Sequence, residues 1–93
     1  MSDYILTMLK ADLGELFPDE ARTEYLIHNI EAAKTLIKRE GVCLRENIED
    51  LELVEMYAAY LIRKRATNEG MPRMLRYALN NRLFSQKAVQ NGS

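Results

Sequence analysis

The chain has 93 residues, of which 47% are apolar and 29% carry a charge, and its formal net charge at pH 7 is −1. This length fits one domain, 1–93, and the apolar content excludes an intrinsically disordered chain. The longest apolar run, Met56 to Ile62, is far shorter than the roughly 20 residues that cross a bilayer, and the first residues lack the pattern of a secretion signal.

The first two predicted helices cover residues 3–13 and 19–40. Apolar residues recur in both at steps of three and four, which places them on one face of a helix. In the second helix this stripe consists of Leu26, Ile30, Ala33 and Ile37. Gly14 and Gly41 stand where a glycine ends a helix in the left-handed conformation. Pro18 is expected in the first turn of the second helix.

The third and fourth predicted helices cover residues 48–65 and 72–86. Asn47 can cap the third helix, and Asp50 stands where a capping-box partner would bond back to it. The middle of this helix is apolar on nearly every side, which predicts a place at the centre of the bundle. Residues 89–93 are predicted to be a frayed tail. The predicted fold class is therefore all-α, a small bundle of four helices with short connections.

No residue pattern in the sequence indicates an active site. His28 and Cys43 are the single histidine and the single cysteine, which leaves no second such ligand for a zinc site. No phosphate-binding loop, nucleophile elbow or metalloprotease motif is present. The lone cysteine also excludes an internal disulfide and indicates folding in a reducing cytoplasm. We therefore predict that the protein is not an enzyme and has no catalytic residue, cofactor, metal, small-molecule substrate or membrane partner.

Charge is divided unevenly along the chain. Residues 1–62 hold 6 basic and 13 acidic side chains, a charge of −7, whereas residues 63–93 hold 7 basic and 1 acidic, a charge of +6. The acidic group near the third helix start consists of Glu46, Glu49, Asp50, Glu52 and Glu55, and the basic group consists of Arg63, Lys64, Arg65, Arg73, Arg76 and Arg82. Helix ends account for part of this division, because acids favour N-termini and bases favour C-termini. The basic group can otherwise contact acids of another subunit or phosphates of DNA.

The run from Leu53 to Lys87, LVEMYAAYLIRKRATNEGMPRMLRYALNNRLFSQK, resembles the C-terminal part of tailed-phage head–tail connector proteins, also called head-completion or adaptor proteins. MYAAYLIRKR and MPRMLRYALNNRLF carry most of the resemblance, and MLKADLG, YLIHNIEAAKTLIKREG and IEDLELV follow the same layout upstream. The resemblance implies a structural protein, made in the host cytoplasm, that forms a ring beneath the portal of the virion. It implies a ring that extends the DNA channel and docks the tail or a stopper protein. The implied partners are further copies, the portal protein and the tail or stopper, while DNA passes without sequence-specific binding.

A ring needs a different contact surface on each side of every subunit. We predict that the acidic group of one subunit faces the basic group of the next, so that reversing Arg73 and Arg76 to Glu blocks assembly without unfolding the monomer. The alternative function is that of a small helical DNA-binding protein that uses the basic region 63–82.

Overall fold

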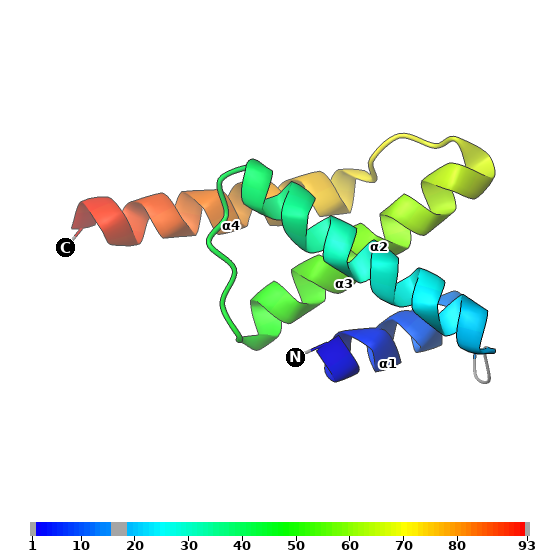
Figure 1. Cartoon of the computed structure of the whole chain (residues 1–93). Helices are drawn as coiled ribbons and strands as arrows, with labels where there is room; N and C mark the ends of the chain where they lie inside the picture. Colours follow the sequence, from blue (N-terminus) through cyan, green and yellow to red (C-terminus); the bar gives the residue numbers. More distant parts are fainter. Residues whose placement is uncertain (1, 16–18, 93) are drawn as a thin grey trace.

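The computed structural model describes residues 2–15 and 19–92 and contains four helices and no strand over these residues (Figure 1). They are α1 (Ser2–Leu13), α2 (Glu20–Arg39), α3 (Ile48–Thr67) and α4 (Arg73–Gly92). The predicted all-α bundle is confirmed. The fourth helix is longer than predicted, because it runs to Gly92 and not to residue 86. Ser93 and the predicted place of Pro18 lie outside the described residues.

The helix ends follow local chemistry that the sequence already indicated. Asp19 accepts a hydrogen bond from the Arg22 amide at 2.7 Å, which caps α2. Gly14 and Gly41 have φ angles of +73° and +104°, and each follows a helix as predicted. Asn68 ends α3 in the same left-handed region, with a φ of +58°.

The cap of α3 is only half of the predicted capping box. Asn47 Oδ1 accepts a hydrogen bond from the Asp50 amide at 2.8 Å, as expected of an N-cap. The Asp50 carboxylate does not return the bond to Asn47, because it accepts the Arg45 amide at 2.7 Å and the side chain of Arg82 instead. Asp50 therefore joins the start of α3 to a distant helix.

The core is built around α3, against which α1, α2 and α4 all pack. This confirms the central position predicted from its apolar middle. The buried apolar residues of α3 are Leu53, Val54, Tyr57, Ala58, Ala59 and Ile62. Burial of one such large aliphatic side chain contributes about 1.5–3 kcal/mol of transfer free energy, which explains why a thin domain depends on this helix.

The fourth helix is the least embedded part of the bundle. Leu75 and Leu79 in its first half are at most 2% exposed and belong to the core. Its second half extends past the C-terminal end of α2 as an arm, with the chain terminus at its tip (Figure 1). The molecule is correspondingly long, with extents of 47 × 27 × 18 Å. Leu83 and the polar side chains of Arg82 and Gln86 hold the base of this arm.

Candidate assembly surfaces

Arg82 and Asp50 bind each other inside a single chain. Arg82 Nε donates to Asp50 Oδ1 at 2.6 Å, and Arg82 Nη2 donates to Asp50 Oδ2 at 3.1 Å. The two residues are 8% and 1% exposed. These hydrogen bonds raise the pKa of Arg82 above its usual value. The sequence placed Asp50 and Arg82 on opposite intersubunit surfaces. This assignment is wrong, because the two buried charges already pair with each other within one chain.

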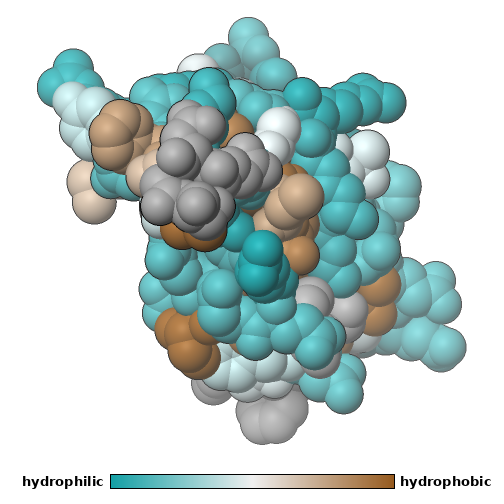
Figure 2. Space-filling view, turned by 90° about the vertical axis from the view of Figure 1, so that its left-hand side faces the viewer, coloured by the Kyte–Doolittle hydropathy of each residue, from teal (hydrophilic) through white to brown (hydrophobic). Residues whose placement is uncertain are grey.

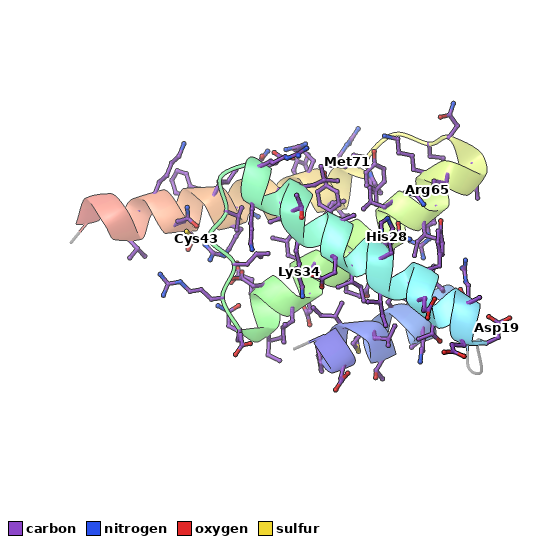
Figure 3. All side chains as sticks on the ribbon, in the orientation of Figure 1. Asp19, His28, Lys34, Cys43, Arg65 and Met71 are labelled. Carbon is purple, nitrogen blue, oxygen red and sulfur yellow. The ribbon has the colours of Figure 1, made fainter. Side chains whose placement is uncertain are left out.

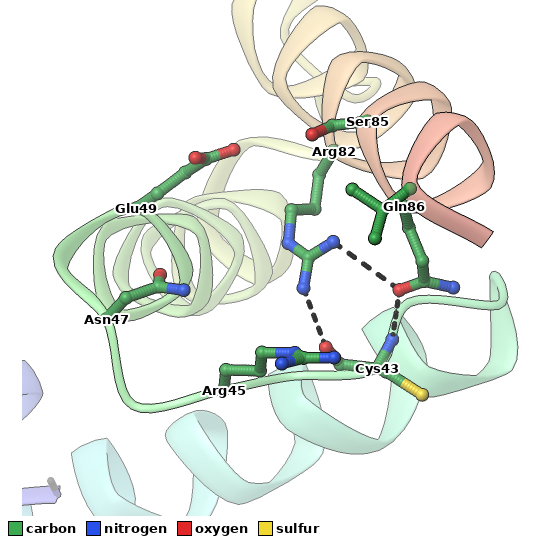
Figure 4. Close-up of a pocket in the computed structure, with 8 residues that line it drawn as sticks. Cys43, Arg45, Asn47, Glu49, Arg82, Ser85 and Gln86 are labelled. Atoms are coloured by element: carbon green, nitrogen blue, oxygen red, sulfur yellow. Dashed lines mark hydrogen bonds between the residues drawn. The ribbon is translucent and has the colours of Figure 1, made fainter. Parts of the chain in front are cut away.

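The same arginine also fixes the connection between α2 and α3. Arg82 Nη2 donates to the Cys43 carbonyl at 2.7 Å (Figure 4). Gln86, one turn further along α4, accepts from the Cys43 amide at 2.8 Å and donates to the Gly41 carbonyl at 2.8 Å. The arm of α4 is therefore tied to the rest of the chain by these hydrogen bonds as well as by Leu83, which packs against the core.

A shallow pocket of about 280 Å³ opens beside this network. Its walls are formed by Cys43, Arg45, Asn47, Glu49, Arg82, Ser85, Gln86 and Val89 (Figure 4). The Arg82 guanidinium and the Gln86 amide in it already bond each other, and Cys43 exposes its thiol with no histidine beside it. This arrangement explains the pocket as the edge of a structural network.

Two further basic residues of the predicted group are neutralised by carboxylates of the same chain. Arg76 binds Glu40 with both terminal nitrogens, at 2.9 Å and 3.2 Å, and this contact raises the pKa of Arg76. Arg63 Nη2 lies 3.4 Å from Asp12 Oδ2 of α1. Reversal of Arg76 would therefore break a contact within the monomer, which corrects the expectation that this change tests assembly alone.

The other three basic residues have no carboxylate partner among the described residues. Lys64 lies over the ring of Tyr60, with its nitrogen 5.8 Å from the ring centroid. Arg65, at the C-terminal end of α3 (Figure 3), lies 5.6 Å from the ring centroid of Tyr25. Arg73 is exposed at the first position of α4. These three side chains leave their positive charge available at the surface.

The acidic group divides in the same way. Glu46, Glu49 and Glu52 are exposed, and none forms an ion pair within the described part of the chain. Glu55 is half-buried instead. Its burial, and then the nearby Asp12 carboxylate, raise the pKa of Glu55 to about 7. Glu55 consequently belongs to the contact between α1 and α3, although the sequence placed it on a subunit surface.

The unneutralised charges lie at the two ends of the central helix. Glu46 and Glu49 stand at the start of α3, and Lys64 and Arg65 stand in its last turn. A helix of 20 residues is about 30 Å long. One small domain thus presents an acidic surface and a basic surface that are far apart.

The sequence search missed an apolar stripe on the outer face of α4. Met74, Tyr77 and Phe84 are 71%, 55% and 76% exposed. They recur at steps of three and seven, opposite the buried Leu75 and Leu79. Seen from the end at which α4 projects, the surface is mainly hydrophilic and its hydrophobic side chains form a few separate patches (Figure 2).

Other chemically notable residues do not form a site. His28 is exposed on α2, and within the described ranges no three His, Cys, Asp or Glu side chains gather as metal ligands would. Asn29 is fully buried, donates to the Tyr25 carbonyl at 2.8 Å and leaves its Oδ1 without a partner. Over the same residues, none of the helices combines the length and apolar character that a membrane span requires.

No protein-family model matches the chain, and no significant match was found among curated proteins or solved structures.

Proposed function

We propose that the chain is a structural assembly protein, the head–tail connector of a tailed phage or prophage. In this role copies form a ring beneath the portal, extend the DNA channel and provide the docking surface for the tail or a stopper protein. The observation that carries the proposal is the separation of unneutralised charge at the two ends of α3. The type of assembly, a ring beneath the portal, is inferred from the resemblance of residues 53–87 to head–tail connector proteins.

The lateral contact follows from this separation. Closed rings are built from two different surfaces that meet at every subunit boundary. Glu46 and Glu49 offer one surface, and Lys64 and Arg65 offer the other. Opposite charges at such a boundary orient the subunits and speed their encounter, and added salt screens the attraction. Asp50 and Arg82 take no part, because they hold the monomer together.

The DNA-binding alternative loses support from the same contacts. Affinity for duplex DNA grows with the number of phosphates that basic residues neutralise. Arg63, Arg76 and Arg82 each face a carboxylate of their own chain. The remaining basic surface is small and belongs to a chain of net charge −1, whereas DNA-binding domains are usually strongly basic. A channel through which DNA slides fits these residues better than a site that grips it.

The experiment is a charge reversal that leaves every ion pair described within the monomer untouched. Lys64→Glu with Arg65→Glu should abolish rings in light scattering and negative-stain images. The second pair, Glu46→Lys with Glu49→Lys, should restore rings when both pairs are changed in the same chain. Lys38→Glu with Arg39→Glu is the matched control, because these two residues are also exposed and also end a helix.

Rings that persist in the Lys64→Glu, Arg65→Glu variant would overturn the lateral contact. Rings lost equally in the control would show that overall charge, not this surface, governs assembly. Circular dichroism of each variant verifies that the monomer stays folded, which is expected because all four positions of the two test pairs are exposed.

A further inference from the structure

The outer face of α4 carries a regular stripe that the fold of one chain leaves open. Its five positions alternate steps of three and four residues: Met74, Tyr77, Asn81, Phe84 and Ala88. This spacing is the pattern by which two helices pack along a shared seam. All five side chains are exposed, and the buried face of α4 points the opposite way. The stripe is therefore open to a second helix.

The stripe contains one polar position, at its centre. Asn81 is exposed and has no side-chain hydrogen-bond partner among the described residues. A single asparagine in such a seam favours a two-stranded, parallel pair, because the two amides bond each other only when they are level. Asn81 therefore favours pairing of α4 with the α4 helix of a second copy of the chain.

The two flanks of the stripe carry opposite charge. Arg73 and Lys87 border one side of it. On the other side α3 contributes Glu49 and Glu52, which line a groove of about 190 Å³ together with Asn81 of α4. When two helices run parallel about a two-fold axis, the basic flank of each faces the acidic flank of the other. An antiparallel pair would oppose base to base and acid to acid, which is unfavourable.

We infer that a second copy of this chain covers the α4 stripe, as a parallel two-fold helix pair with Asn81 facing Asn81 and Arg73 facing the partner's acidic flank. This contact shares Glu49 with the lateral ring contact and otherwise uses different residues. It goes beyond the proposed function, because it describes the free protein. The seam is only about four helical turns long and buries less than the roughly 800 Å² per partner of a standard interface, so the dimer dissociates on dilution.

Sedimentation velocity across protein concentration tests the pair. At high salt, where the rings dissociate, the wild type should show a monomer–dimer equilibrium, and Phe84→Glu should weaken it at least tenfold. Ile27→Glu is the matched control, since Ile27 is an exposed apolar residue of α2, 41% accessible, away from the stripe. A wild type that stays monomeric at every concentration, or equal weakening by both variants, would overturn the inference.

Disulfide trapping tests the orientation. In a Cys43→Ser background, Tyr77→Cys and Phe84→Cys should each form a disulfide with the identical position of a second chain. An antiparallel pair would give no such symmetric disulfide, and dimers without it would overturn the parallel arrangement. The ring variant Lys64→Glu, Arg65→Glu should still form the dimer, whereas Phe84→Glu should still form rings. If both variants lost the dimer and the ring together, one contact would serve both assemblies. That result would overturn the inference of a dimer distinct from the ring.

Discussion

Arg82 on α4 and Asp50 on α3, 32 residues apart in sequence, share two hydrogen bonds of 2.6 and 3.1 Å in the interior of the chain. The pair lies where α4 leaves the apolar core, so it fixes the direction in which the arm projects. Because Asp50 and Arg82 pair inside the bundle, fewer charged residues remain for contact with other molecules than the sequence predicted.

The first prediction concerns this pair. Arg82→Met or Asp50→Leu alone should lower the free energy of unfolding by about 3–5 kcal/mol, because each leaves an uncompensated buried charge. The double variant should be more stable than either single variant. Urea denaturation of all four proteins measures this. A double variant whose loss equals the sum of the single losses would mean that the two side chains act independently.

The second prediction concerns the end of α2. Gly41 has a φ of +104°, and a Cβ added there would lie 3.4 Å from Leu83 Cδ2. Gly41→Ala should therefore destabilise the protein by about 1 kcal/mol or more. Gly70 has an ordinary φ and open space around it, so Gly70→Ala serves as the control and should leave the melting temperature equal or higher. Equal losses in the two variants would contradict this reading of the turn.

The third prediction concerns pH. Burial and Asp12 raise the pKa of Glu55 from its ordinary value of 4.5 to about 7, while Arg63 opposes the shift and Glu52 adds to it. Between pH 4.5 and 7 the folded chain therefore holds a proton that the unfolded chain releases, so the contribution of Glu55 to stability falls as pH rises.

Glu55→Gln keeps the shape and removes this titration. The variant should match the wild type near pH 4.5 and should be the more stable protein at pH 8. Thermal melts at both values check the difference. A stability difference that is the same at both pH values would show that Glu55 does not titrate in this window.

The fourth prediction concerns the cap of α3. Asn47→Ala removes the 2.8 Å bond from the Asp50 amide and should cost about 1 kcal/mol of stability. Asn80→Ala is the control, because Asn80 is exposed within α4, where alanine favours the helix. Thermal denaturation should rank the control above the wild type and Asn47→Ala below it; the reverse order would exclude Asn47 as the cap.

The sequence predicted the helices well because their signals are local. Each signal acts on neighbours only a few residues away: the apolar spacing, the cap at Asn47, and the helix ends at Gly14 and Gly41. The structure has all of them in the expected roles. The continuation of α4 through residues 89–92 was not predicted, because a polar ending with a glycine is typical of a fraying terminus.

The charged groups were harder to interpret because their partners are distant in sequence. Asp50 and Arg82 carry the same formal charge whether they face solvent or each other, and only the packing of α4 on α3 brings them together. The α4 stripe could have been predicted, since its steps of three and four are local. The inner stripe of Leu75, Leu79 and Leu83, at steps of four, is enough by itself to indicate the helix.

We propose that copies of the chain assemble through unlike charged surfaces into a closed ring. Light scattering combined with negative-stain imaging, over a range of protein concentration at low and high salt, tests this assembly. Closed rings of uniform size are expected at low salt, with dissociation at high salt and no retention of duplex DNA at physiological salt. Particles no larger than a dimer under every condition, together with salt-sensitive binding of duplex DNA, would contradict it and favour the DNA-binding alternative.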